Sequence, residues 1–154
     1  MTRAVFDCVV LLQAAGYPGG PAGACFETIR QKRVELLLSA AVLEEIEDVL
    51  FRPKIRKKFK TLSDEAANKF LDDLCQFAKF VDPVPREFDY PRDPQDERYI
   101  NLALAANAKL LVSRDNDLLD LMDDHAFRTA YPALTILDPV AFLQALPNDP
   151  TPTN

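Results

Sequence analysis

Short apolar runs alternate along the chain with longer segments whose apolar residues recur at helical spacing. The length of a run distinguishes the two kinds of element, because strands are short and helices are longer. The pattern predicts strands at Ala4–Phe6, Val34–Leu38, Phe80–Val84, Leu110–Val112 and Thr135–Leu137. Between them it predicts helices at about 21–32, 40–51, 64–79, 95–107, 116–123 and 139–146. This alternation is typical of an α/β domain with a central, mainly parallel sheet of about five strands.

One carboxylate interrupts the first apolar run, RAVFDCVVLL at residues 3–12. An ionised Asp in an apolar setting costs several kcal/mol unless a turn, a partner or a metal compensates it. Asp7 follows the strand, and the run alone leaves two roles open: a cap of the turn, or a metal ligand or nucleophile. Ligands bind beyond the carboxyl ends of parallel strands. Because Asp115 follows the strand at 110–112, we expect both carboxylates at the same edge of the sheet.

Length and composition indicate one domain, predicted at 1–146, followed by a polar, Pro-rich tail at 147–154 that we expect to be disordered. The three cysteines form no C-x-x-C pair, so neither a zinc site nor a disulfide framework is predicted. No apolar run approaches the roughly 20 residues of a membrane span. With no signal-like segment at the N-terminus, the expected location is the cytoplasm.

The predicted helix at 40–51 carries four acids, which its geometry separates. At about 100° per residue, its apolar residues form one stripe. Glu44 and Asp48 point away from the stripe toward solvent, whereas Glu45 and Glu47 flank it and could reach over the rim of a cleft. Only Glu45 and Glu47 therefore remain candidates for a site.

The segment RDPQDERYINLALAANA has the features of a helix start. Asp93 is suited to be the N-cap and Pro94 the first helical residue. Capping accounts for Asp93, but less well for Asp96, which shares a helix face with the apolar Ile100. Asp96 is therefore the better functional candidate of the two.

The segment LLVSRDNDLLDLM places a helix start directly after a strand. Asp115 or Asn116 could cap this helix, and Asp117 could favour its positive end. Taken with the acids of the other segments, Asp115 is also a candidate ligand.

Four segments thus each place an acid at a strand end or helix start. Carboxylates held close together repel and raise one another's pKa. A divalent cation removes this repulsion, and Mg²⁺ or Mn²⁺ prefers such hard oxygen ligands. Phosphodiester hydrolysis is the chemistry that suits an all-carboxylate metal site.

The order of these pieces resembles the PIN domain, and in particular VapC-like toxin components of bacterial toxin–antitoxin pairs. The matching pieces are RAVFDCVVLLQA, LEEIEDVLFRPK, DPQDERYINLALAANA and LLVSRDNDLL, and the resemblance covers roughly residues 3 to 143. The alignment with the family pattern selects Glu45 over Glu47. It implies four catalytic acids, with Asp117 added to the metal ligands: Asp7, Glu45, Asp96, Asp115 and Asp117.

The resemblance implies a three-layer sandwich of helices around a parallel sheet, with Mg²⁺- or Mn²⁺-dependent endoribonuclease activity. It also implies an RNA substrate, a small antitoxin protein as partner, and a homodimer.

Two positions depart from the family pattern. After its first Asp the family has a small polar residue and then Asn, whereas this chain has Cys8 and Val9. Val9 cannot hydrogen-bond through its side chain, which leaves Asp7 with fewer hydrogen-bonding groups around it.

The alternative hypothesis is a catalytically impaired PIN-fold module that binds RNA or protein. A third hypothesis is a phosphatase with Asp7 as nucleophile, because VFDCVV resembles the first motif of the haloacid dehalogenase family. That family needs an Asp where Val9 stands.

A basic run, RPKIRKKFK at Arg52–Lys60, holds six of the 18 Lys and Arg residues of a chain whose net charge is −6. It is either a solvated helix end or a local positive strip for an RNA backbone. Arg114, beside Asp115, could touch a substrate phosphate. The predicted RNA contacts are Arg52, Lys54, Arg56, Lys57, Lys58 and Arg114.

Overall fold

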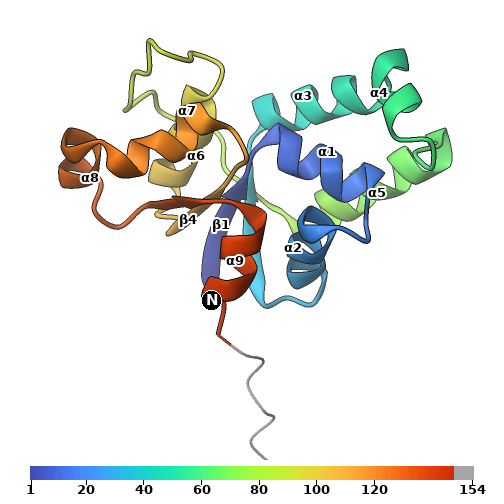
Figure 1. The fold of residues 1–154 in the computed structure, drawn as a ribbon, viewed down its shortest axis with the longest axis horizontal. Helices are drawn as coiled ribbons and strands as arrows, with labels where there is room; N and C mark the ends of the chain where they lie inside the picture. The colour runs from blue at the N-terminus through green and yellow to red at the C-terminus, as the bar shows by residue number, and fades with distance from the viewer. Residues whose placement is uncertain (148–154) are drawn as a thin grey trace, which may run out of the picture.

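A single five-stranded sheet organises the computed structural model, which describes residues 1–147 (Figure 1). Every neighbouring pair of strands is parallel, and the strand order is β3-β2-β1-β4-β5. The strands are β1 (Thr2–Phe6), β2 (Val34–Leu38), β3 (Lys79–Phe80), β4 (Leu110–Val112) and β5 (Thr135–Leu137). The predicted α/β class with about five parallel strands is confirmed. Apart from Pro147, the predicted tail lies outside the described residues.

Helices cover both faces of the sheet (Figure 1). On one face α2 and α9 pack against β2, β4 and each other, and α1 packs on α2; on the other face α6 packs against β1, β2 and β4. The helices are α1 (Cys8–Gly16), α2 (Pro21–Arg30), α3 (Ala40–Leu50), α4 (Pro53–Lys58), α5 (Asp64–Phe77), α6 (Glu97–Ala105), α7 (Asn116–Leu119), the 3-10 turn η1 (Asp120–Asp123), α8 (His125–Ala130) and α9 (Pro139–Ala145). Within residues 1–147, no helix combines the length and the apolar character required to cross a membrane.

Helix α1 is the main element that the apolar pattern did not predict. It begins directly after Asp7, whose side chain accepts a hydrogen bond from the Val10 backbone and caps the helix. Because α1 packs against α2, α3 and α5, most of its residues are buried, and no polar face marks it as helical in the sequence. A helix without a polar face cannot be distinguished from a buried strand by periodicity.

Smaller differences from the prediction concern element boundaries. Helix α6 begins at Glu97 because residues 94–96 form a turn, and the last predicted strand residues, 81–84, lie outside the two-residue β3. The short helices α4 and α8 were not predicted, and the predicted helix at 116–123 divides into α7 and η1. A helix of six residues is too short to show a periodic apolar face.

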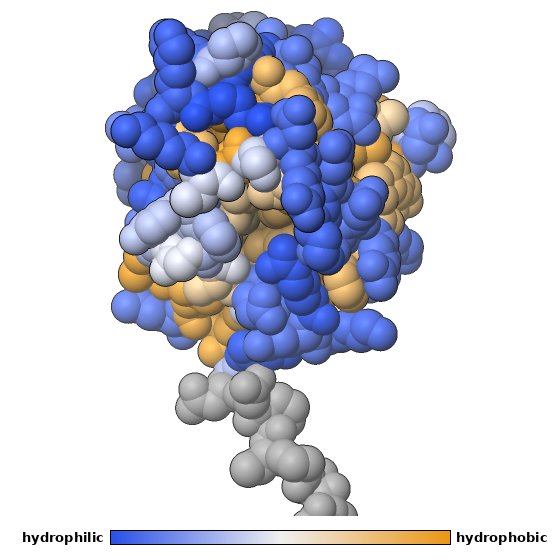
Figure 2. Space-filling view, turned by 90° about the vertical axis from the view of Figure 1, so that its right-hand side faces the viewer, coloured by the Kyte–Doolittle hydropathy of each residue, from blue (hydrophilic) through white to orange (hydrophobic). Residues whose placement is uncertain are grey.

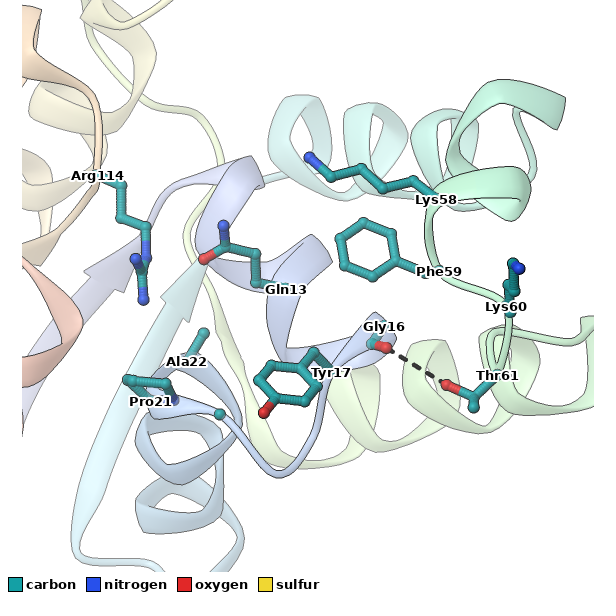
Figure 3. Close-up of a pocket in the computed structure, with 11 residues that line it drawn as sticks. Gln13, Gly16, Tyr17, Pro21, Ala22, Lys58, Phe59, Lys60, Thr61 and Arg114 are labelled. Atoms are coloured by element: carbon teal, nitrogen blue, oxygen red, sulfur yellow. Dashed lines mark hydrogen bonds between the residues drawn. The ribbon is translucent and has the colours of Figure 1, made fainter.

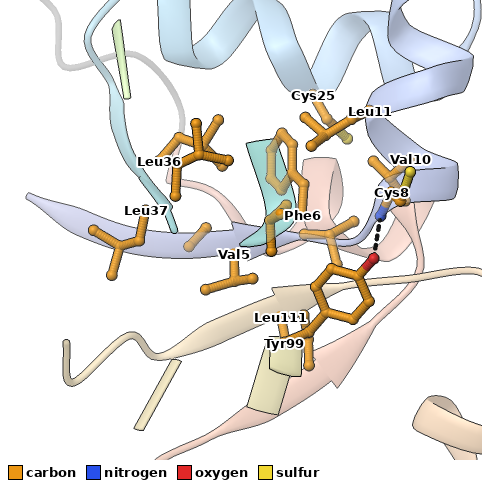
Figure 4. Packing of buried hydrophobic residues seen from close by; sticks show 14 of the residues in the cluster. Val5, Phe6, Cys8, Val10, Leu11, Cys25, Leu36, Leu37, Tyr99 and Leu111 are labelled. Carbon is orange, nitrogen blue, oxygen red and sulfur yellow. Dashed lines mark hydrogen bonds between the residues drawn. The ribbon is translucent and has the colours of Figure 1, made fainter. Parts of the chain in front are cut away.

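The core lies on both sides of β1, whose Ala4, Val5 and Phe6 are fully buried (Figure 4). Phe6 meets Phe142 of α9 edge to face, with 5.5 Å between the ring centroids. On the other side, the Tyr99 hydroxyl of α6 accepts a hydrogen bond of 3.2 Å from the Cys8 backbone (Figure 4). The core thereby holds the start of α1 against both the sheet and α6.

The sheet's switch point lies between β1 and β4. Phe6 pairs with Val112, and the Asp7 backbone N–H continues this pairing with a 3.1 Å bond to the Val112 carbonyl. After these residues the chain turns into α1 from β1 and toward α7 from β4. In parallel sheets, ligands bind outside the carboxyl ends of the strands at such a switch point. Asp7 and residues 113–117 follow the two strands at this point.

We predict that Gly16→Ala destabilises the protein and that the matched change Gly19→Ala does not. A Cβ atom at Gly16 would lie 2.5 Å from Cγ and Cδ1 of Phe59, whereas at Gly19 nothing lies within 4 Å. Overpacking of this kind typically costs about 1–3 kcal/mol, while exposed substitutions stay within about 0.5 kcal/mol. Urea unfolding measures both, and equal midpoints for the two variants would contradict the prediction.

Candidate metal centre

Four aspartates gather beyond the carboxyl ends of β1 and β4. One carboxylate oxygen from each of Asp93, Asp96, Asp115 and Asp117 lies within 4.8 Å of the others. Asp96 is buried and the other three are half-buried. The structure thus brings together three of the five predicted metal ligands and adds Asp93 to them. We refer to these four residues as the aspartate cluster.

The turn before α6 supplies two members of the aspartate cluster. The Asp93 side chain accepts hydrogen bonds from the backbone N–H groups of Gln95 and Asp96, at 3.2 and 3.3 Å. Asp96 stands at the N-cap position of α6, yet its side chain makes no capping bond, and its Oδ2 atom is buried without a hydrogen-bond partner among the described residues. The sequence predicted Asp93 as the N-cap of this helix and Pro94 as its first residue, but the structure has Asp96 at the N-cap and residues 94–96 in a turn. The signal that could have placed Asp93 in the site was the spacing D-P-x-D.

The loop after β4 supplies the other two members. Asp115 caps α7 through Oδ1, which accepts a 2.9 Å bond from the Asp117 backbone. The Arg92 guanidinium pairs with Asp117 at 2.8 Å and with Asp120 at 3.0 Å. Asp117 is therefore partly neutralised by Arg92, whereas Asp96 has no such basic partner among the ion pairs of residues 1–147.

Asp7 is connected to the aspartate cluster through Ser113. Its Oδ1 accepts a 2.9 Å bond from the Val10 backbone, and its Oδ2 accepts a short bond from the Ser113 hydroxyl. The same hydroxyl oxygen accepts a 2.9 Å bond from the Asp115 backbone. Both Asp7 and Ser113 are almost fully buried, at 3% and 0% exposure. No role was predicted for Ser113, although it occupies the first position of the Ser-x-Asp piece in LLVSRDNDLL.

Glu45 approaches from α3 and lies outside the aspartate cluster. Its Oε2 atom accepts hydrogen bonds from Arg98 at 3.0 Å and from the Tyr99 hydroxyl at 2.9 Å. Tyr99 also binds the Cys8 backbone, so it connects Glu45 to the residue that follows Asp7. Tyr99 was not identified from the sequence, since a tyrosine on the apolar face of a helix carries no signal beyond burial.

Burial and mutual repulsion perturb the carboxyl groups. The pKa of Asp96 is raised to about 9, chiefly by burial and then by hydrogen bonding and charge repulsion with Asp115, with a further contribution from Asp93. The pKa of Asp7 is raised to about 6 by burial, against the hydrogen bonds from Ser113 and Val10, with smaller contributions from Asp115 and Glu45. With a pKa of about 9, Asp96 needs a positive charge beside it to be ionised near neutral pH.

The donor set fits a hard divalent cation. Carboxylate oxygens are the ligands that Mg²⁺ and Mn²⁺ prefer, and the unpartnered, buried Oδ2 of Asp96 is an acceptor that the protein itself leaves without a donor. Each of the four aspartates can offer one oxygen to such an ion, and Asp96 is the buried one among them. The assignment of Asp7 and Glu45 as ligands stays a prediction.

The predicted RNA contacts divide into two groups. Arg52 forms an ion pair with Asp48, and Arg56 pairs with Asp64 at 2.8 Å and donates to the Leu50 carbonyl at 2.7 Å. These internal contacts give Arg52 and Arg56 a structural role at the start of α4. The others are exposed and form no ion pair within residues 1–147: Lys54, Lys57, Lys58 and Arg114.

We predict that Ser113→Ala weakens binding of Mn²⁺ on the order of 10-fold or more, because the substitution removes the group that orients Asp7 and Asp115. It also leaves buried polar groups without partners, which costs about 1–3 kcal/mol of stability. Calorimetric titration with Mn²⁺ and urea unfolding measure the two effects. Ser63→Ala, which removes the cap of α5, serves as the control that lowers stability alone. Unchanged Mn²⁺ affinity in Ser113→Ala would refute this positioning role.

We predict that the metal-free protein loses stability as pH rises from about 4 toward 9. Asp7 and Asp96 keep protons in the folded state up to pKa values of about 6 and about 9, whereas the unfolded chain releases them near 3.8. In that window the folded state binds more protons, so the free energy of unfolding falls as pH rises. Urea unfolding in EDTA across this range measures the fall. Asp96→Asn should flatten it and Asp124→Asn, at the cap of α8, should not; parallel curves for wild type and Asp96→Asn would contradict the assignment.

Comparison with known proteins identifies the fold family. The model of the PIN domain family matches residues 3–117, about three quarters of the chain. The chain is also 28% identical over 128 residues to "Uncharacterized protein MJ1680" of Methanocaldococcus jannaschii, a match that covers 81% of this chain and 78% of the relative. The matched region contains the whole aspartate cluster, together with Asp7, Glu45 and Ser113. The chain therefore belongs to the PIN domain family, whose members are generally metal-dependent nucleases.

Proposed function

We propose that the protein is a metal-dependent endoribonuclease that hydrolyses phosphodiester bonds of RNA. The observation that carries the proposal is the buried Oδ2 atom of Asp96, which lacks a hydrogen-bond donor in residues 1–147 and belongs to a cluster of four carboxylates. Such a group suits Mg²⁺ or Mn²⁺. Membership of a family of nucleases supports the same chemistry.

The side chains at and near the aspartate cluster would have different roles in the reaction. Asp96 and Asp115 would hold the ion, and Asp93 and Asp117 would lie beside them. When bound, the ion would activate water and stabilise the negative charge that develops on the phosphoryl oxygens. Asp7 orients Ser113, and Ser113 in turn fixes the Asp115 backbone. These contacts hold Asp115 in place before the substrate arrives, which avoids reorganisation during the reaction.

Glu45, on α3, adds a further carboxylate near the acids of the site. The Arg98 guanidinium and the Tyr99 hydroxyl orient its carboxylate, and its charge acts on Asp7 and Cys8. Arg98 and Glu45 form an ion pair of 3.0 Å. Glu45 is thus a residue that adds negative charge for the cation without being buried itself.

Val9, the motive for the hypothesis of an impaired enzyme, is 47% exposed. The two oxygens of Asp7 receive their hydrogen bonds from Ser113 and from the Val10 backbone instead. A polar side chain at position 9 is therefore not needed to satisfy Asp7 in this protein. This observation favours the active enzyme over a module that only binds RNA or protein.

The proposal extends to the biological setting that the motifs indicated. On the resemblance of four sequence pieces to VapC-like components, we propose a toxin role in the cytoplasm, with a small antitoxin protein as partner and a homodimer as the working form. The positively charged residues of the 52–60 segment and Arg114 would attract the RNA backbone to an otherwise acidic protein.

We predict that the wild-type protein cleaves single-stranded RNA when Mg²⁺ or Mn²⁺ is present and not in EDTA. Asp96→Asn and Asp115→Asn should each lower the rate on the order of 100-fold or more, because each removes a charged ligand from the aspartate cluster. Gel analysis of a labelled RNA measures the rates, and calorimetry measures Mn²⁺ binding by the same preparations.

The matched control is Asp124→Asn, an acid outside the aspartate cluster that caps α8 and that Asn can replace as a cap. This variant should cleave at the wild-type rate. The proposal fails if the wild-type protein cleaves no RNA with either metal and calorimetry detects no binding of either.

A further inference from the structure

A groove of about 750 Å³ opens beside the candidate metal centre, between the end of α1, the start of α2 and the end of α4 (Figure 3). Arg114, which directly precedes Asp115 of the aspartate cluster, lies at one side of it, and the residues of the α4–α5 connection lie at the other. Through Arg114 the groove borders the loop that carries Asp115, and from there it runs along the end of α1. It is a second feature of the surface that the aspartate cluster does not explain.

Positive charge collects along this groove. Lys58, Lys60 and Arg114 line it, none of its lining residues is acidic, and these three cations form no ion pair within residues 1–147. The N-terminus of α2, where Gly20 gives no side-chain cap, adds positive partial charge at the same wall. On a chain with a net charge of −6, this concentration indicates an anionic ligand.

The surrounding surface is mixed in character. Figure 2 views the molecule from the side that carries α4 and α5 in Figure 1, and shows mostly hydrophilic residues with hydrophobic ones between them and a hollow near the centre. A ligand on this side of the molecule would meet apolar surface as well as charge. This combination suits a single-stranded nucleic acid, which offers both phosphates and unstacked bases.

An exposed aromatic ring stands in the groove in a defined position. Tyr17 is 63% exposed, yet its ring lies so close to Gly20 that a Cβ there would be 2.5 Å from Tyr17 Cδ1. Gly16 allows the Phe59 ring to approach α1 in the same way, and its carbonyl accepts a 3.5 Å bond from the Thr61 hydroxyl (Figure 3). The absence of a Cβ at these two glycines thus allows two aromatic rings to pack against the backbone. A ring that is packed in this way before binding loses less entropy when a base stacks on it.

A buried acceptor also lies in this groove. The Oε1 atom of Gln13 is buried and has no hydrogen-bond partner among the described residues, and Gln13 lies between Arg114 and Phe59 in the groove (Figure 3). A buried acceptor without a donor indicates a missing partner. An amino group of a base or a ribose 2′-hydroxyl, both donors, would supply it.

We infer that this groove binds a single-stranded segment of RNA that flanks the cleaved bond, with phosphates at Lys58, Lys60 and Arg114 and a base stacked on Tyr17. The position of the cleaved bond rests on the proposed function, whereas binding in the groove does not require metal or cleavage. A duplex is excluded as the preferred ligand because its bases are already stacked on one another and cannot reach Tyr17.

Fluorescence anisotropy with the full-length protein and a labelled single-stranded RNA of about 12 nucleotides tests the inference in EDTA, where no cleavage occurs. Lys58→Ala/Lys60→Ala should weaken binding on the order of 10-fold and reduce the slope of log affinity against log salt by about 1.4. Tyr17→Ala should weaken binding on the order of 10-fold with an unchanged slope, and Tyr17→Phe should bind as the wild type does.

Two further double variants separate the groove from general attraction. Lys109→Ala/Arg128→Ala removes the same charge from exposed residues that do not line the groove and should change affinity less than about twofold. Lys54→Ala/Lys57→Ala lies on α4 outside the groove and should weaken binding less than Lys58→Ala/Lys60→Ala does. Equal losses in all double variants, or a normal affinity in Tyr17→Ala, would overturn the inference.

The failure of this inference is distinguishable from the failure of the proposed function. Asp96→Asn should bind the RNA in EDTA with an affinity similar to that of the wild type while its cleavage with Mn²⁺ is lost. A wild-type protein that binds through the groove and cleaves nothing would remove the proposed activity and leave the groove. Cleavage with no effect of the groove variants on affinity, or tighter binding of a duplex of the same sequence, would remove the groove alone.

Discussion

The hydrogen bond from the Ser113 hydroxyl to Asp7 joins the carboxyl ends of β1 and β4, and the geometry of the site depends on it. Asp7 caps α1 with its other oxygen, and Ser113 accepts from the Asp115 backbone. One buried contact therefore sets where α1 begins and where the loop toward α7 runs. Because both groups are withdrawn from water, the loss of either would leave one buried hydrogen-bonding atom of the other unpaired: Oδ2 of Asp7 or the hydroxyl hydrogen of Ser113.

The carboxylates of the aspartate cluster repel one another in the folded protein. Asp96, Asp115 and their neighbours occupy a space in which burial and proximity raise the pKa of the most buried carboxyl groups. A protein selected only for stability would place apolar residues there, since unpaired buried carboxyls destabilise the fold at neutral pH. The repulsion is useful when a cation is bound, because the same carboxylates then become its ligands. The chain thus gives up stability at the switch point, where ligands bind to sheets of this kind.

Helix α1 connects the two parts of the surface that the proposals assign to RNA. Its first turn is fixed by Asp7 and Tyr99 at the metal centre, and its last residue, Gly16, packs against Phe59 in the basic groove. The helix has nine residues and is therefore roughly 13 Å long. This length separates the metal centre from the far end of the basic groove. Since α1 is buried on most sides, it forms a rigid wall between them.

The sequence by itself determined the α/β class, the five strands and the acids at strand ends and helix starts, because alternating periodicity and capping are local properties. It could not show α1, since a helix buried among α2, α3 and α5 lacks a polar face. It also treated Asp93 as a cap only and gave Ser113 and Tyr99 no role. Only the tertiary structure decided which acids meet. The order β3-β2-β1-β4-β5 makes β1 and β4 neighbours and pairs their last residues, Phe6 and Val112, which lie far apart in the chain, and no local pattern encodes that order.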